Sequence, residues 1–362
     1  MLNNTIEKRM ANLFFSELLS KRFNSDAILD LRTLPHDNAK VLIISDFHMG
    51  SGKRDDFRAN GEMVGRILEE YYFKKGWYLV LNGDIEELAK YSFSDIRSEW
   101  EYIYQVFDLF ASAGRLYKTL GNHDEELVFE RSYPYPLYNA VRIETGIVPV
   151  YVYHGHQSSM MYTVFNNIIR LGLKYLLKPV GIRNISSARS PKRSFHVERA
   201  AYTFSLGNNC ISVIGHTHRS LFESLSRFDY IKFEIERHCR DYPSSSGEDR
   251  ERIAGEVRAL RGELGKLKRN ERREAYNLYG AELPLPCLFN SGSAIGKKGI
   301  NAIELDKENI SLVYWFAAGQ GMKFISRGWH KIEKTAGACR AVLNKARLDY
   351  IKAKIELFND EP

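Results

Sequence analysis

Five short apolar runs mark the first two thirds of the chain, and each one ends directly in a cluster of polar residues. The runs cover residues 41–45, 78–82, 116–120, 148–153 and 210–214. Residues 61–73 and 95–112, which separate the first three runs, are long enough for crossover helices. Strands that alternate with helices predict a largely parallel sheet. Ligands of such sheets bind beyond the carboxyl ends of the strands, where all five polar clusters lie.

Three further segments complete the expected architecture. Residues 1–30 predict a helix, because their apolar side chains recur at helical spacing. Residues 300–305 and 310–315 flank a polar turn, and we expect a hairpin there, in a second sheet packed on the first. Residues 335–358 predict a closing amphipathic helix.

Two segments interrupt this plan. Residues 157–205 are basic and are expected to form a helical cap. Residues 228–280 are densely charged, and their apolar positions form a short seam with the spacing 4, 3, 4, 3 (Ile253, Val257, Leu260, Leu264 and Leu267). Such a seam predicts a helical hairpin or a homodimer contact through 253–267.

The expected organisation therefore has five parts. They are an N-terminal helical segment (1–39), a core (40–227) that includes the cap, a charged helical hairpin (228–280), a second-sheet hairpin that completes the core (281–320) and a C-terminal helical segment (321–362).

Composition narrows the class of protein. Of the 362 residues, 44% are hydrophobic and 27% are charged, which is ordinary for a globular protein and excludes wholesale disorder. The net charge is +7, and the window 160–200, with eight cations and one acid, carries the same +7. The basic excess is thus local. Four widely separated cysteines argue against a disulfide framework and against a thiolate zinc site.

The sequence also bears on location. The N-terminal residues include acids and lack a continuous apolar stretch, so we expect no signal peptide. A run of about 18 or more apolar residues, as a spanning helix needs, does not occur. We therefore expect a cytoplasmic protein, with peripheral contact at the inner face of the membrane through 160–178 as an alternative.

The polar clusters hold six of the ten histidines together with acids and an amide. They are His48, His123, His154, His156, His216 and His218, beside Asp46, Asp84 and Asn122. A single histidine after a strand usually makes only a structural hydrogen bond. Six of them at one sheet edge indicate a divalent cation, and the absence of thiolates favours Mn, Mg, Fe or Zn.

These clusters resemble a known series of motifs. In order they read Asp46-x-His48, Gly83-Asp84, Gly121-Asn122-His123-Asp124, His154-Gly-His156 and Gly215-His216-x-His218. All five resemble the ordered motifs of the calcineurin-like metallophosphoesterases, and Asn290-Ser-Gly-Ser293 resembles the Asn-x-Gly stretch that follows in many members. Each motif alone is weak, but five in order are specific. The resemblance implies an α/β fold, a four-layer αββα sandwich of two mixed sheets with helical insertions.

The resemblance also implies two divalent metal ions, with Mn expected first and Mg, Fe or Zn as alternatives. By the family's pattern, Asp46, His48 and His218 bind the first ion, Asn122, His154 and His216 bind the second, and Asp84 bridges them.

The same pattern gives roles to three residues beside the metals. His123 would stabilise or protonate the leaving oxygen, and Asp124 would orient His123. His156 matches a position that does not usually bind metal, so it would support the ligands or make a structural hydrogen bond.

Such a centre implies a hydrolase of phosphate ester or pyrophosphate bonds. Two cations about 3.5–4 Å apart would clamp the phosphoryl oxygens and lower the pKa of a bridging water toward neutrality. The resulting hydroxide would attack phosphorus in line, and the cations would stabilise the charge that develops.

The basic cap bears on the substrate. Residues 160–178 predict an apolar helix with a narrow basic stripe, which could contact a membrane, line an acyl pocket or simply pack on the core. Arg183, Arg189 and Arg193 are candidate phosphate contacts. This cap resembles that of the UDP-diacylglucosamine hydrolases of lipid A synthesis, as does the Gly-Asp-x-x-Glu pattern at 83–87, although those enzymes have Arg in place of His123. The resemblance implies a phosphorylated small-molecule, nucleotide-sugar or lipid-linked substrate.

Other functions fit the same residues. A phosphodiesterase or nuclease, a nucleotide pyrophosphatase and a protein phosphatase are all compatible with the motifs, so nucleic acid stays among the alternative partners. A nuclease would use an open basic groove with aromatic side chains, and the basic window has few of these. Outside catalysis, the chain could be an assembly protein with a vestigial metal site, but the intact set of ligands argues against this.

Overall fold

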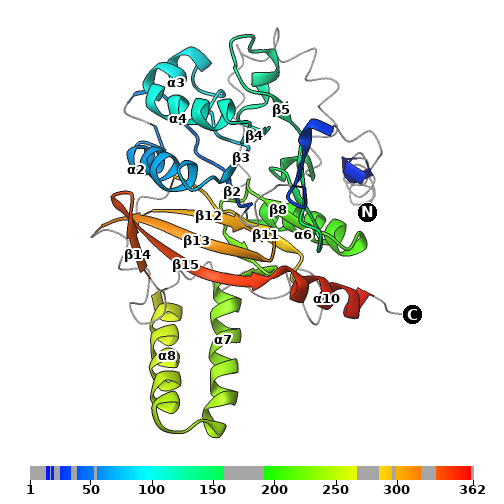
Figure 1. The fold of residues 1–362 in the computed structure, drawn as a ribbon, viewed down its shortest axis with the longest axis vertical. Coiled ribbons are helices and arrows are strands. Elements are labelled where there is room, and N and C mark those ends of the chain that lie inside the picture. Colours follow the sequence, from blue (N-terminus) through cyan, green and yellow to red (C-terminus); the bar gives the residue numbers. More distant parts are fainter. Residues whose placement is uncertain are drawn as a thin grey trace.

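The computed structural model describes residues 14–16, 18–19, 25–33, 39–52, 55–158, 191–266, 285–295, 299–318 and 332–359. Within this part of the chain two mixed β-sheets pack face to face, and helices cover their outer sides (Figure 1). The α/β class and the two mixed sheets predicted from the sequence are confirmed.

The strands before the first three motifs lie in an eight-stranded sheet. Its order among the described residues is β14-β15-β13-β12-β2-β3-β4-β5, with β2 to β5 parallel and the other neighbours antiparallel. The strands are β2 (Val41–Ile44), β3 (Tyr78–Asn82), β4 (Leu116–Thr119), β5 (Leu137–Tyr138), β12 (Ile300–Leu305), β13 (Asn309–Ala317), β14 (Ile332–Thr335) and β15 (Ala338–Arg347).

The strands before the fourth and fifth motifs lie in the other sheet, which has the order β1-β6-β7-β8-β11-β9-β10. The pairs β1–β6, β7–β8 and β8–β11 are parallel. The strands are β1 (Ile28–Asp30), β6 (Val141–Glu144), β7 (Pro149–Val152), β8 (Ile211–Ile214), β9 (Leu221–Phe222), β10 (Leu225–Ser226) and β11 (Leu288–Asn290).

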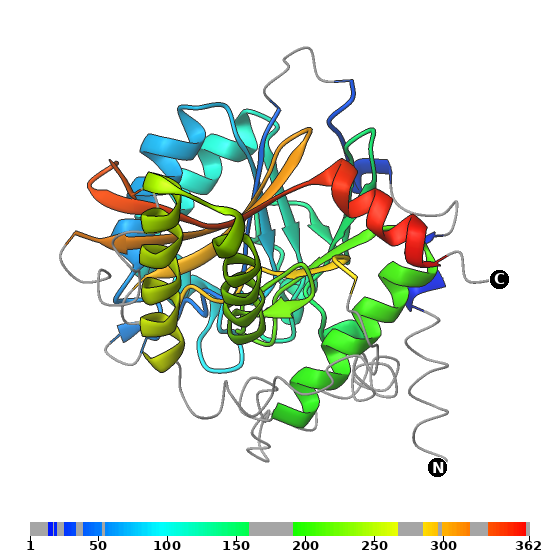
Figure 2. The same cartoon turned by 90° about the horizontal axis from the view of Figure 1, so that it is seen from below.

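Helices form the outer layers. The eight-stranded sheet is covered by α2 (Gly61–Ile67) with its π-helical continuation η3 (Leu68–Phe73), α3 (Phe93–Glu99) and α4 (Glu101–Ser112). On the other flank, α6 (Pro191–Gly207) packs against β8 and β11, and α10 (Leu348–Asn359) lies beside it (Figure 2). None of the helices in the described residues is long and apolar enough to cross a membrane.

The alternation of side chains along β2 explains why this strand is central. Val41 and Ile43 belong to the core between the sheets, whereas Leu42 and Ile44 pack under the helices of the outer layer. All four side chains are buried, because successive residues of a strand point to opposite faces. A run of consecutive apolar residues is therefore what this position requires.

The hairpin of β12 and β13 corrects one expectation. It was expected in a second sheet, but Ile303 of β12 pairs with Ile43, so the hairpin extends the sheet that contains β2 to β4. The reason lies in β12, whose residues are buried on both faces, with Leu305 in the core between the sheets and Ala302 under the helices.

The prediction of a C-terminal helical segment (321–362) is wrong for the first described part of that segment. Residues 332–335 and 338–347 are strands β14 and β15, and the helix begins only at Leu348. Ala336 and Gly337 have φ values of 50° and 67°, and the flanking Thr335 and Ala338 pair with each other. Two left-handed residues make the turn that a tight hairpin prefers. The lengthy pairing of β15 with β13 then overrides the helical spacing.

The N-terminal helical segment (1–39) is corrected in the same way. Residues 14–16 and 18–19 are helical, but Ile28–Asp30 is strand β1, because it pairs in parallel with β6.

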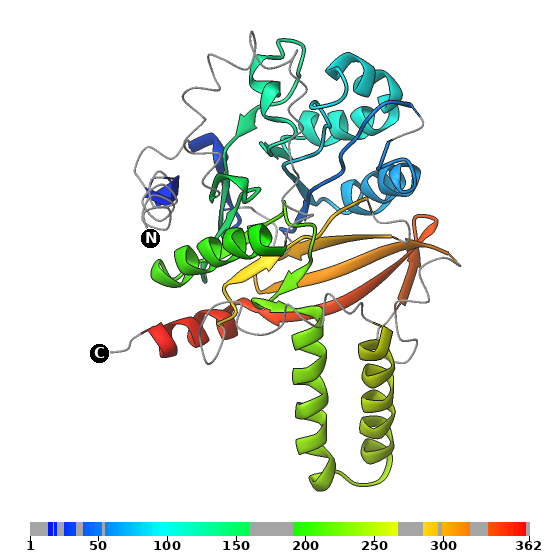
Figure 3. The same cartoon turned by 180° about the vertical axis from the view of Figure 1, so that it is seen from behind.

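The charged insertion forms a helical hairpin that projects from the sandwich (Figure 3). It consists of α7 (Arg227–Asp241) and α8 (Gly247–Lys266), which pack against each other. Within the chain Ile253 and Leu260 of the seam are buried. His238 Nδ1 of α7 lies 3.4 Å from Glu256 Oε2 of α8. The homodimer contact through 253–267 stays a prediction.

A buried cluster of charges lies beneath the loops that follow β3 and β4. Glu86, Lys118 and Asp124 have no exposed surface. Lys118 Nζ donates to Asp124 Oδ2 at 2.5 Å and lies 3.4 Å from Glu86 Oε2. The other hydrogen bonds of the Asp124 carboxylate come from the backbone N–H groups of Gly121 (2.6 Å) and Ile85 (2.8 Å). The cluster therefore fastens one loop to the other.

The charges in this cluster depend on one another. Burial raises the pKa of Glu86 to about 7, even though the Lys118 ammonium acts in the opposite direction. Burial also disfavours the charge on Lys118, but the adjacent Asp124 and Glu86 carboxylates raise the pKa of the ammonium above its ordinary value. Removing one partner of a buried ion pair leaves the other charge without compensation.

We predict that Lys118→Met destabilises the protein by about 3–5 kcal/mol near pH 8, the usual cost of breaking a buried ion pair. Without the ammonium, the folded-state pKa of Glu86 rises further above its unfolded value. A carboxyl group with a raised folded-state pKa favours folding at low pH, and this benefit is lost as the pH rises. The loss of stability caused by Lys118→Met should therefore be smaller at pH 5 than at pH 8. Urea unfolding at both pH values measures this difference.

The exposed Lys74→Met is the matched control, and it should change stability by no more than about 0.5 kcal/mol. A deficit of Lys118→Met that is equal to that of the control, or that does not change with pH, would contradict the role of the cluster.

Candidate metal centre

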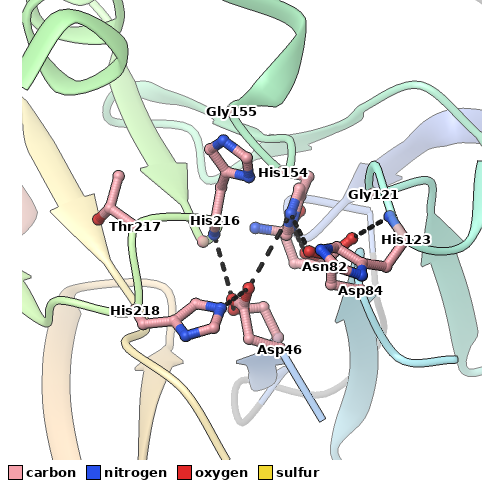
Figure 4. A network of polar contacts seen from close by, with 12 residues as sticks. Asp46, Asn82, Asp84, Gly121, His123, His154, Gly155, His216, Thr217 and His218 are labelled. Carbon is pink, nitrogen blue, oxygen red and sulfur yellow. Dashed lines mark hydrogen bonds and ion pairs between the residues drawn. The ribbon is translucent and has the colours of Figure 1, made fainter. Parts of the chain in front are cut away.

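The predicted metal ligands lie in five loops at one edge of the sandwich, and both sheets contribute to them (Figure 4). The loops after β2, β3 and β4 carry Asp46, His48, Asp84 and Asn122, and the loops after β7 and β8 carry His154, His216 and His218. The carboxyl ends of strands from two facing sheets therefore meet at one place, where a single sheet would spread the same residues along its edge.

One group of possible ligands consists of Asp46, His48 and His218, whose ligand atoms all lie within 4.8 Å of one another. His218 Nε2 is 3.1 Å from Asp46 Oδ1 and 3.1 Å from His48 Nε2. This is the set that the sequence assigned to the first metal.

A second group consists of Asp84, His154 and His216, again with all ligand atoms within 4.8 Å. His154 Nε2 lies 3.1 Å from Asp84 Oδ2. These residues were assigned to the second metal, with Asp84 as the bridge.

The two groups adjoin each other through their carboxylates. Asp84 Oδ2 is 3.8 Å from His48 Nε2, and Asp46 Oδ1 is 4.0 Å from His154 Nε2. Asp84 also forms a third group of possible ligands with His48 and His123. Its carboxylate thus faces both sets, which is the position that a bridging ligand requires.

The fit of these residues to cations is visible in their unused polar atoms. Asp46 Oδ1, Asn122 Oδ1, His154 Nε2 and His216 Nε2 are buried and accept or donate no hydrogen bond within the described residues. Leaving a buried polar atom without a partner costs about 1–3 kcal/mol. Four such atoms that come from four different loops fit the oxygen and nitrogen ligand set of divalent cations.

The second polar atom of several of these side chains is held by the protein. Asp46 Oδ2 accepts a hydrogen bond from the backbone N–H of His216 (3.1 Å), and Asp84 Oδ1 accepts one from the N–H of His123 (2.8 Å). His154 Nδ1 is 2.8 Å from the carbonyl oxygen of Asn82, to which it donates. Each side chain is thereby oriented with its other ligand atom toward the centre.

The backbone around the centre is strained. Asp46, His48, Asp84, His216 and His218 all have φ between 49° and 63°. Left-handed conformations cost non-glycine residues of order 1–3 kcal/mol each and persist only where the surroundings enforce them. Such strain gathers at functional sites.

Gly121 shows how closely two of the loops approach. A Cβ atom at this position would lie 2.2 Å from Asp84 Oδ1 and 2.3 Å from the Asp84 backbone nitrogen. Only glycine allows the loop after β4 to approach Asp84 so closely. The neighbouring Asn122 follows directly in the same loop, and its Oδ1 is buried.

The electrostatic environment favours ionised carboxylates. Burial would raise the pKa of Asp84, but the adjacent charge of His154, whose Nε2 lies 3.1 Å from Asp84 Oδ2, lowers it well below its ordinary value. Burial and repulsion by His154 lower the pKa of His216, so this ring is neutral. Burial opposes charge on His154 as well, yet Asp84 and Asp46 raise the pKa of His154 to about 9. A cation would therefore compete with a proton at that ring.

His123 is oriented by Glu87, a residue to which the sequence had given no role. His123 Nδ1 lies 2.8 Å from Glu87 Oε1, and the other oxygen of Glu87 lies 3.2 Å from His48 Nδ1. Burial would lower the pKa of His123, but the Glu87 hydrogen bond and the Asp84 charge raise it to about 9. The sequence feature that could have identified Glu87 is its position three residues after Asp84, in Gly83-Asp84-Ile85-Glu86-Glu87.

The expectation that Asp124 orients His123 is wrong. The Asp124 carboxylate bonds to Lys118 and to the N–H groups of Gly121 and Ile85, as described above. Its hydrogen bonds therefore hold backbone, and its place is in the support of the loops.

His156 contacts an acid at the edge of the centre. Its Nε2 lies 3.1 Å from Glu125 Oε1, and its ring centroid is 5.4 Å from that of His154 and 6.1 Å from that of His216. Glu125 is not one of the predicted ligands, so this contact matches the structural hydrogen bond named as the alternative, and a role of His156 in supporting the ligands stays a prediction.

The predicted substrate contacts are not placed. Arg183, Arg189 and the segment 160–178 lie outside the described residues, and Arg193 lies in α6 without a described side chain.

Comparisons with known proteins bear on the family. No curated protein matches the chain significantly. Among solved structures, a phosphoesterase from E. coli, Yfce, aligns with 14% identity and a TM-score of 0.31, covering 75% of this chain and 91% of its own. A family model of the calcineurin-like phosphoesterases matches residues 39–220, which is half of the chain and includes all five motifs. The chain therefore belongs to the calcineurin-like phosphoesterase family.

Proposed function

We propose that this metal-dependent phosphoesterase works with two adjacent metal ions and hydrolyses a phosphate ester or pyrophosphate bond. The observation that carries the proposal is the set of four buried ligand atoms that make no hydrogen bond to the described residues, contributed by Asp46, Asn122, His154 and His216. Asp84 lies between the two ligand groups. A single ion would leave one of these groups unused.

When bound, two divalent cations would supply an activated water and positive charge for the phosphoryl oxygens. Ligands that are all oxygen or nitrogen suit Mn, which we propose first, and Mg, Fe or Zn as alternatives. The negative charge of Asp46 and Asp84 disfavours an anionic substrate. Asn122 is a neutral ligand and does not add to this charge.

His123 is the residue that we propose to act on the leaving group. Hydrolysis forms a bond from a water oxygen to phosphorus and breaks the bond to the leaving oxygen, which then needs a proton. Glu87 occupies Nδ1 of His123, so Nε2 is the atom available to donate this proton. The Glu87 carboxylate at Nδ1 favours the protonated form of the His123 ring.

We propose a substrate with an apolar part, such as a lipid-linked or nucleotide-sugar phosphate. The basic and apolar window at 160–200 supports this at the level of sequence. In the structure, the 3-10 helix η4 (Glu125–Phe129) directly follows the His123 loop, and its Val128 and Phe129 are 50% and 55% exposed. Two consecutive exposed apolar side chains suit contact with an apolar substituent.

Loss of a residue that only supports a metal ligand reduces activity by a factor of about 10–100. Asp84→Ala should reduce turnover of a bis-aryl phosphate by more than this factor, because both metals lose a ligand. Its circular dichroism spectrum should stay that of the wild type. Elemental analysis should find less than the two Mn equivalents expected for the wild type. The exposed Glu308→Ala is the control. Full activity of Asp84→Ala, freed of contaminating phosphatase, would refute the bridging role.

His123→Asn should lower kcat by about 10²–10⁴ for an ester with a poor leaving group, such as an alkyl phosphodiester. For a p-nitrophenyl ester, whose leaving group needs no proton, the loss should be much smaller. Glu87→Gln should show the same pattern more weakly, since it acts through the ring. Equal losses for both esters would argue that His123 does not protonate the leaving oxygen.

The substrate class can be decided by comparing four compounds with Mn²⁺ present. We expect hydrolysis of a UDP-linked acylated sugar to exceed that of a single-stranded oligonucleotide and of a phosphopeptide, with a bis-aryl phosphate as the general reference. Turnover of the reference without any turnover of the acylated sugar would exclude the lipid-linked substrate. Preference for the oligonucleotide would favour the nuclease instead.

A further inference from the structure

A buried carboxylate outside the motifs lies behind the fifth motif loop. Glu198 belongs to α6 and has no exposed surface. Its Oε1 accepts a hydrogen bond from Thr217 Oγ1 at 2.9 Å and lies 3.3 Å from Arg219 Nε. Its Oε2 pairs with the other end of the same guanidinium. One helix thus binds two residues of the loop after β8.

Thr217 is the link between this carboxylate and the metal ligands. It stands between His216 and His218, and Figure 4 shows it beside both. Its hydroxyl also accepts a hydrogen bond from Asn290 Nδ2 at 2.9 Å, and the same amide donates to the carbonyl oxygen of Gly215 at 2.9 Å. The hydroxyl is therefore held from two sides, by α6 and by the end of β11.

This loop needs such support, because its conformation is unfavourable. His216 and His218 have φ values of 63° and 55°. Strained residues keep their conformation only where several contacts fix them, and Thr217 is the residue on which the contacts converge. A buried charge is costly unless it is paired, and the Glu198 carboxylate is paired with Arg219 of this loop.

We propose that Glu198 is a positioning residue, which holds His216 and His218 in the geometry for metal binding through Thr217 and Arg219. The proposal rests on the proposed function, because it takes the two histidines as metal ligands. Its consequence is that α6, which forms the last part of the basic insertion (157–205), is part of the support of the metal centre. In the sequence, Glu198 stands out only as the single acid of the basic window 160–200.

The test measures the Mn²⁺ affinity of the metal-free protein by calorimetry. The activity of the Mn²⁺-saturated protein is measured separately. Glu198→Gln and Thr217→Val should each weaken Mn²⁺ binding about 10–100-fold, the usual effect of losing a partner that orients a ligand. Thr217→Ser, which keeps the hydroxyl, should recover most of the affinity. At saturating Mn²⁺, kcat for a bis-aryl phosphate should return toward the wild-type value, with KM within threefold. The exposed Thr203→Ala on α6 is the control and should bind as the wild type does.

The outcomes separate the two hypotheses. Folded Glu198→Gln and Thr217→Val that bind Mn²⁺ within twofold of the wild type would overturn this inference and leave the proposed function intact. If Glu198→Gln does not fold, Thr217→Val with its serine counterpart decides alone. A wild type that binds Mn²⁺ but hydrolyses no phosphoester would overturn the proposed function, while the affinities would still decide the role of Glu198. A wild type that binds no Mn²⁺ would overturn both.

Discussion

The structure depends on a small set of buried polar atoms that make no hydrogen bond within the part of the chain that the structure describes. Asp46 Oδ1, Asn122 Oδ1, His154 Nε2 and His216 Nε2 meet at the edge of two sheets, in a place that excludes most of the water. Each such atom costs free energy when it is unpaired, and the Asp46 carboxylate is also repelled by that of Asp84. A fold tolerates this arrangement only if the rest of the molecule is stable enough to hold it. The two apolar cores on either side of the eight-stranded sheet supply that stability.

The support of the centre is built from pairs of loops rather than from single loops. Asp46 accepts the N–H of His216 across the sandwich, and Asp124 joins the loops after β3 and β4 with the help of Lys118. Because every loop is fastened to another one, the left-handed backbone of the ligands cannot relax independently. The buried charges Glu86, Lys118 and Glu198 all belong to this support, which explains why the fold retains groups that are costly to bury.

The two insertions have different relations to this centre. α6 forms the last part of the basic insertion (157–205) and contacts the loop of His216 and His218 through Glu198. The hairpin of α7 and α8 projects from the body of the molecule, and its apolar seam is partly covered within the chain (Figure 3). The family match ends at residue 220, before this hairpin begins. Features that distinguish this chain from its family are therefore expected in the cap for substrate choice and in the hairpin for contacts with other molecules.

The sequence by itself determined the candidate metal ligands, the strands that precede them and the family, because each motif is local and follows an apolar run. It did not determine which sheet each strand joins. The β12–β13 hairpin and strand β15 are set by pairing with distant strands, and a pairing partner cannot be read from local spacing. Nor could it assign the partners of buried charges: Glu87 took the place expected of Asp124, and Glu198 looked like an isolated acid among bases. Hydrogen bonds between residues far apart in the chain arise only when the tertiary structure brings their loops together, and so only the folded molecule decided them.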